Sequence, residues 1–224
     1  MDCRSEERRK QIVENYDVVP KAHIKLLAGQ IKESDAGGII KNDYYIFEAA
    51  HMEDGNSEII LCGMGAARDF LKLLKHKGLP IFNPLHGEGG YAGGDPQGGE
   101  EVEDNGNDDP QRGDGGRGEW NPIARQLYNA CMWVIIIIDA KAGTPIFKIQ
   151  EKVYNFRNRV PFESQIKGVN TIIRKNMQGR TLTEEIDRLR GNNDIRNELC
   201  QFDMLVDMIN NLTDESGNHI KSYF

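Results

Sequence analysis

The sequence of 224 residues has few cysteines and no long apolar run, and each absence narrows the class of protein. Its four cysteines, Cys3, Cys62, Cys131 and Cys200, are widely scattered and form no CxxC pair, so no disulfide framework is indicated. The longest apolar run, 130–138, has nine residues, whereas a helix needs about 20 to cross a bilayer. The N-terminus is charged where a secretory signal would be apolar. We therefore expect a cytoplasmic protein with free thiols and no membrane contact.

Charge is distributed unevenly along the chain, although the net value is only −7. Residues 86–119 hold 12 of the 24 glycines and 10 of the 35 acidic residues, with two of the 28 basic residues. Such a tract has too little apolar surface to offset the entropy of ordering it, so we predict a flexible acidic linker. The segment 141–180 has the opposite charge, with nine basic residues and only two acidic ones, Glu151 and Glu163.

Residues 1–85 are expected to form a small α+β unit. Ser5, followed by two glutamates, is a typical helix N-cap. Pro20 suits the first turn of a second helix over 20–34, in which Ile24 and Ile31 share an apolar stripe. Short segments rich in β-branched and aromatic residues then predict a three-stranded antiparallel meander, followed by a helix and an edge strand: 38–41, 44–51, 57–63, 65–78 and 79–85.

Residues 120–213 are expected to form a bundle of about five helices, followed by a tail at 214–224. Asn121 and Pro122 are a typical helix start, and apolar residues recur from there at helical spacing. The β-branched run 134–138 also favours a strand, which would require a break near Cys131. No turn residue makes that break, so we prefer a helix. The predicted fold class is therefore α+β and mostly helical.

Asp139 and Lys141 have the acid-x-lysine spacing with which a strand of PD-(D/E)xK nucleases holds a metal. On a helix the two side chains would point about 200° apart, and we expect them to be surface residues.

The rival enzyme hypothesis is a metal-dependent nuclease of the ββα type. His51 would be its general base, Asn56 would orient His51, and His76 would bind a divalent metal. Ala50 stands where such a site would need an acid, so this remains the alternative. Without that activity no cofactor is indicated. Zinc at Cys62 and calcium in 86–119 are also weak candidates, since neither has a complete ligand pattern.

The function that we expect is non-enzymatic interaction through the basic helices of 141–180. Their cationic residues interleave with aromatic ones, a mixture suited to an acidic protein surface or a nucleic acid. The acidic tract 86–119 would compete for the same surface. The sequence gives no indication of oligomeric state. The expected binding residues are Lys148, Lys152, Arg157, Arg159, Lys167, Arg174 and Lys175.

Overall fold

The first half of the chain folds around a four-stranded mixed sheet, in agreement with the predicted α+β class. The computed structural model describes residues 1–86 and 119–224. The strand order is β3-β2-β1-β4, in which the first three are antiparallel neighbours and the short edge strand β4 runs parallel to β1. The strands are β1 (Tyr16–Lys25), β2 (Asp43–His51), β3 (Ser57–Gly63) and β4 (Ile81–Phe82).

The helix predicted over 20–34 is wrong, because its first residues belong to β1. A β-bulge between Pro20 and Ala22 interrupts the pairing with β2, which is how a proline is tolerated inside this strand. The bulge also shifts the alternation of side chains. Val18 therefore packs on one face of the sheet, while Ala22 and Ile24 pack on the other. The strand predicted at 38–41 is also wrong, since only an isolated bridge forms there.

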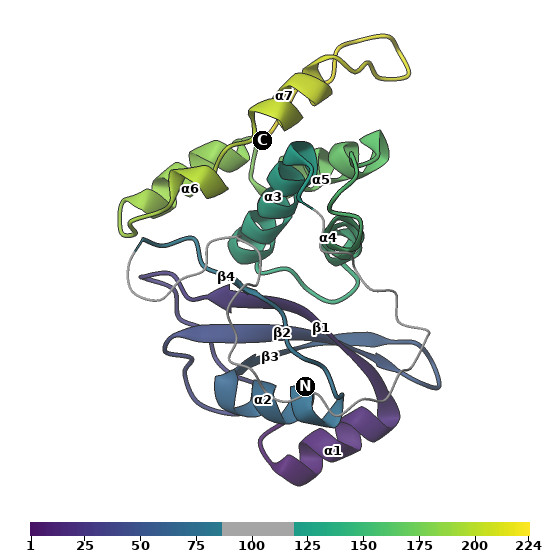
Figure 1. Cartoon of the computed structure of the whole chain (residues 1–224), viewed down its shortest axis with the longest axis vertical. Helices are drawn as coiled ribbons and strands as arrows, with labels where there is room; N and C mark the ends of the chain where they lie inside the picture. Colours follow the sequence, from purple (N-terminus) through teal and green to yellow (C-terminus); the bar gives the residue numbers. More distant parts are fainter. Residues whose placement is uncertain (87–118) are drawn as a thin grey trace.

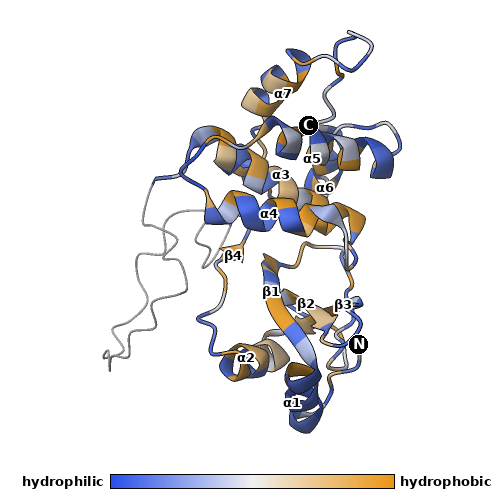
Figure 2. Ribbon diagram, turned by 90° about the vertical axis from the view of Figure 1, so that its right-hand side faces the viewer, coloured by the Kyte–Doolittle hydropathy of each residue, from blue (hydrophilic) through white to orange (hydrophobic). Residues whose placement is uncertain are grey.

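Helices α1 (Glu6–Asn15) and α2 (Met64–Leu73) cover one face of the sheet (Figure 1). Ser5 is the N-cap of α1, as predicted, and its hydroxyl accepts a hydrogen bond from the Arg8 amide at 3.1 Å. Helix α1 is mostly hydrophilic along its length (Figure 2). Phe70 of α2 packs against Phe47 of β2, and their ring centroids are 5.2 Å apart. A compact core therefore lies beneath this face.

Five helices lie on the opposite side of the sheet, in agreement with the predicted bundle (Figure 1). The first of them contains the run 134–138, so the helical interpretation of that run is confirmed. Asn121 caps it by accepting hydrogen bonds from two backbone amides, and its buried Trp133 donates to the Leu199 carbonyl at 2.9 Å. The helices are α3 (Pro122–Ile138), α4 (Pro145–Asn155), α5 (Glu163–Asn176), α6 (Leu182–Arg190) and α7 (Asp203–Asn210), with a short 3-10 helix at Asn197–Leu199.

A buried lysine joins the sheet to the helical layer. Lys21 is only 8% exposed, and its Nζ lies 3.3 Å from the Glu48 carboxylate of β2 and 2.9 Å from the Glu151 carboxylate of α4. Pairing on both sides is what allows a charge to be buried at such a junction. The bulge in β1 places this side chain on the side of the sheet that faces α4.

The remaining predictions concern the cysteines, the membrane and the tract 86–119. All four cysteines are free thiols. No helix in 1–86 or 119–224 has the length and hydropathy needed to cross a membrane. The flexible linker predicted for 86–119, and the weak calcium candidate in the same tract, fall almost entirely outside the described residues.

Candidate interaction surface

The segment 141–180 forms the turn after α3, helix α4 and helix α5. Two exposed lysines lie four residues apart on α4 and so share one side of that helix. Two more cationic residues are exposed in the last turn of α5, where the helix dipole favours positive charge. The predicted binding residues on these two helices are Lys148, Lys152, Arg174 and Lys175, which are exposed, and Lys167, which is half-buried.

Arg157 contributes to an aromatic cluster that holds the end of α4 against α3. Its guanidinium lies 5.3 Å from the ring centroid of Tyr154 and 6.0 Å from that of Trp120. The Arg157 carbonyl accepts the backbone amide of Asn121 at 2.8 Å. Tyr128 completes the cluster, and burial raises the pKa of its hydroxyl well above the ordinary range, so the phenol stays neutral. Arg157 therefore has a clear structural function.

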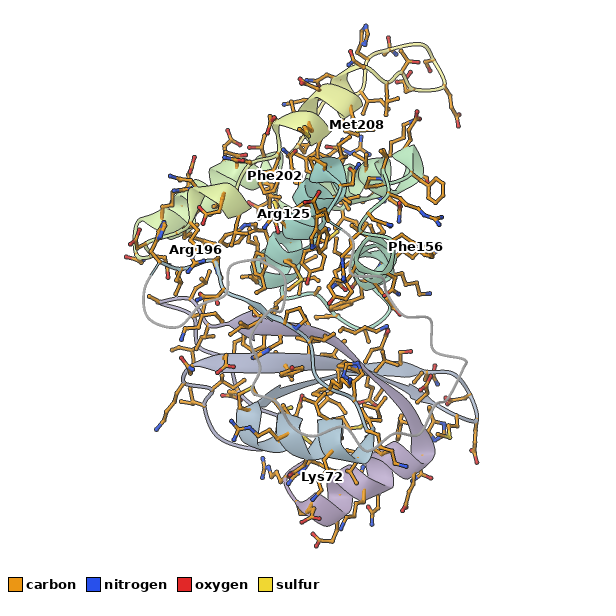
Figure 3. All side chains as sticks on the ribbon, in the orientation of Figure 1. Lys72, Arg125, Phe156, Arg196, Phe202 and Met208 are labelled. Carbon is orange, nitrogen blue, oxygen red and sulfur yellow. The ribbon has the colours of Figure 1, made fainter. Side chains whose placement is uncertain are left out.

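Exposed apolar side chains gather where α4 gives way to α5. Phe156, Val160 and Phe162 are 55%, 56% and 76% exposed, which is unusual for large apolar residues so close together. They border a cavity of about 260 Å³, which we call the aromatic groove. Phe156 lies on the outer side of α4 (Figure 3). The groove is lined by Ala124, Lys152, Val153, Phe156, Arg159, Val160, Pro161, Phe162 and Gln165.

The local sequence explains how the backbone at Phe162 is held. Phe162 occupies the N-cap position of α5, where a side-chain oxygen normally accepts a backbone amide of the first turn. A phenyl ring has no such oxygen. Instead, the Gln165 side-chain carbonyl accepts the Phe162 amide at 2.8 Å, which fixes the backbone at the helix start. The residue directly before Phe162 is the buried Pro161, whose ring fixes its own backbone φ angle. The ring is thus presented on a constrained backbone.

Two cations border the aromatic groove. The Arg159 guanidinium lies 5.6 Å from the ring centroid of Phe156, a cation–π distance, and Lys152 is exposed on α4. Both were expected to bind a partner because of their charge. Their position beside exposed apolar surface was not evident from the sequence. The aromatic pattern does not distinguish Phe156, which is exposed, from Phe147, which is buried in the core.

The residues of the nuclease hypothesis lie in three different segments of the chain. His51 ends β2, and Asn56 lies in the β2–β3 turn, where its side-chain amide donates to Asp54 at 2.7 Å. His51 Nδ1 lies 3.2 Å from an Asp54 carboxylate oxygen. His76 follows α2, and its Nδ1 accepts the Gly78 amide at 2.9 Å. In the part of the chain that the structure describes, no group of three His, Cys, Asp or Glu side chains is arranged to hold a metal.

The other candidate residues have partners or environments of their own. Asp139 caps the end of α3 in a left-handed conformation, and its carboxylate accepts from Lys32 Nζ at 2.6 Å. Lys141 is exposed in the following turn. Cys62 is fully buried, and burial raises the pKa of its thiol well above the usual value, as expected for an unreactive core cysteine.

A family model described as uncharacterised conserved protein UCP028583 matches residues 1–214. The chain belongs to this family. No curated protein and no solved structure matches the chain significantly. The matched range of this chain contains the whole sheet, all seven helices of the described residues and the aromatic groove.

Proposed function

We propose that this protein binds an acidic segment of a partner protein on the surface of α4 and α5, without catalysing a reaction. The observation that supports the proposal is the aromatic groove, with its exposed Phe156, Val160 and Phe162 bordered by Lys152 and Arg159. The four free thiols accord with a cytoplasmic setting, which is part of the same proposal.

The apolar wall of the groove favours a protein over a nucleic acid. Its lining includes Ala124, Val153, Val160 and Pro161, whose side chains offer no hydrogen-bond donor or acceptor to the edge of a base. Protein interfaces are typically built from an apolar centre rich in aromatic residues, surrounded by a polar rim in which arginine is frequent. An apolar side chain of the partner would fill the groove.

The charges around the groove favour acidic residues beside that apolar anchor. Lys148 and Lys152 share one side of α4. A carboxylate placed between them would gain two favourable contacts while still partly hydrated, which raises the association rate more than the affinity. We therefore expect binding to weaken at high salt.

The acidic tract would modulate this binding by occupying the same surface. Residues 100–109 contain six acidic residues and no basic one. The described chain resumes at Glu119, next to Trp120, whose ring lies over the Arg157 guanidinium. The nine residues between 109 and 119 span at most about 30 Å, and they lead to Trp120, whose ring centroid is 6.1 Å from that of Tyr154 on α4.

Fluorescence anisotropy with a labelled synthetic peptide tests the proposal. The peptide alternates phenylalanine or leucine with pairs of glutamates, and its controls replace the apolar residues by serine or the glutamates by lysine. A single-stranded DNA oligonucleotide of the same net charge is measured in parallel. We expect the apolar acidic peptide to bind most tightly, and Phe162→Ser to weaken it about tenfold, because the ring is exposed and its loss removes contact area alone.

Met52→Ser is the matched control, since Met52 is 63% exposed in the β2–β3 turn on the sheet side of the molecule. It should leave the affinity unchanged. If the DNA binds more tightly than every peptide, or if the serine-substituted peptide binds as well as the apolar one, the proposed partner class is wrong.

A further inference from the structure

A second groove lies between α4, α5 and the turn after α3, with a volume of about 670 Å³. We call it the lysine groove. Ile138, Ile149 and Ile172 give it an apolar lining, and each of them is half-buried. Lys141, Lys167 and Lys175 add three ammonium groups. Its volume is in the range of small-molecule sites, and it shares no lining residue with the aromatic groove.

The cations of the lysine groove are largely uncompensated. In the part of the chain that the structure describes, no carboxylate lies within ion-pair distance of Lys141 or Lys175. Lys167 is 3.9 Å from Glu163, at the limit of such a contact. Asp139 also lines the groove, but one of its carboxylate oxygens accepts a hydrogen bond from Lys32. The local balance is therefore positive.

Helix geometry gives the groove a length. Lys167 and Lys175 are eight residues apart on α5, which corresponds to about 12 Å along the helix axis. Gly168 lies between them on the α5 wall, and a Cβ at this position would come within 3.1 Å of Ile149 Cδ1. A larger residue there would press on the apolar wall.

We propose that the lysine groove binds a free small-molecule amphiphile, with an apolar body and a carboxylate or phosphate group. The isoleucines would cover the apolar body, and one or two lysines would hold the anionic group. A small inorganic anion would leave the apolar lining unused, whereas a neutral apolar compound would leave the ammonium groups unpaired. This site is separate from the aromatic groove, so it does not depend on the function proposed above.

The test is a titration of the full-length ¹⁵N-labelled protein with decanoate, followed by amide chemical shifts. We expect the shifts to be confined to 138–149 and 167–176. Decanol and inorganic phosphate, each carrying half of the proposed chemistry, should bind at least about tenfold more weakly. Vesicles of anionic phospholipid, assayed by sedimentation, distinguish a membrane surface from a free ligand.

The decisive variant is Lys141→Gln with Lys175→Gln, because both side chains are exposed and their loss should not disturb folding. It should weaken decanoate binding at least about tenfold. The matched control, Lys72→Gln with Lys77→Gln, removes the same charge from exposed lysines on and just after α2, across the sheet (Figure 3), and should bind like the wild type.

Equal binding by the variant and the control would overturn the proposal, as would shifts located elsewhere, phosphate binding as tightly as decanoate, or binding only to vesicles. The peptide assay of the aromatic groove is independent, so each proposal fails or succeeds by its own measurement.

Discussion

Replacing Lys21 by methionine is expected to destabilise the fold by about 3 kcal/mol, although methionine fills a similar volume. Lys21 Nζ lies 3.3 Å from Glu48 and 2.9 Å from Glu151. At an effective dielectric constant of about 20, each contact supplies roughly 5 kcal/mol of gross attraction. Desolvation of Lys21, whose side chain is 8% exposed, and of Glu48, at 16%, offsets most of that gain.

The loss arises from what the substitution leaves behind. Glu48 would remain mostly buried with its cation removed, and an uncompensated buried charge typically costs about 3–5 kcal/mol. The lower end applies because Glu48 also accepts a weak hydrogen bond from the Gly143 amide at 3.4 Å. Glu151 is 46% exposed, so Glu151→Gln should cost no more than about 1 kcal/mol.

Urea denaturation followed by tryptophan fluorescence measures these values, because Trp133 is fully buried among the helices. Combining Lys21→Met with Glu48→Gln removes both charges and should return the stability to within about 1 kcal/mol of the wild type. The reasoning is refuted if Lys21→Met costs less than about 1 kcal/mol, or if the double variant is no more stable than the single one.

Three further predictions concern other parts of the molecule. Asn121→Ala should lower stability by about 1 kcal/mol in thermal denaturation, because Asn121 accepts two amides at the start of α3; an unchanged midpoint would contradict this. Burial raises the pKa of the Cys3 and Cys200 thiols to about 11, so their labelling by a disulfide reagent at pH 8 should be slow, accelerate as pH rises towards 11, and become fast in urea. Deleting residues 88–118 should tighten binding of the acidic peptide and make it less salt-sensitive, whereas an unchanged anisotropy titration would exclude competition by this tract.

Helix α3 was predictable because its signals are local. Asn121 and Pro122 mark its start, and Gly143 lies in the turn that follows it. Apolar residues at helical spacing between these points outweighed the β-branched run 134–138, since burial in a helical layer overrides the intrinsic preference of such residues.

Strand β1 was missed because its pattern depends on a bulge. A regular strand shows apolar residues at every second position. Here the bulge between Pro20 and Ala22 shifts the alternation of side chains between the two faces of the sheet. Ile24 then also fits the spacing of an apolar stripe on a helix. The partner strand that decides between the two interpretations pairs with β1 at separations of 18 to 35 residues, from Lys25 with Asp43 to Tyr16 with His51, so no local pattern contains it.

The aromatic groove was only partly predictable. Its cations and Phe156 and Phe162 belong to the basic, aromatic pattern of 141–180, yet Phe147 of that pattern is 1% exposed. Which ring reaches solvent depends on how α4 is rotated against α3, and that rotation is set by packing. The lysine groove has the same origin, since its lining joins residues up to 38 positions apart, from Ile138 to Asn176.

The bulge in β1 lets a single strand serve both hydrophobic cores, with Val18 in one and Ala22 in the other. A chain cut within 87–118 would leave the core around Val18 whole in the N-terminal piece and divide the other, so that Ile24 and Ile46 would be exposed to water. Neither fragment should be well folded by itself, but the two should assemble when mixed. The protein is therefore a natural candidate for fragment complementation, in which recovery of the fold reports that two pieces have met.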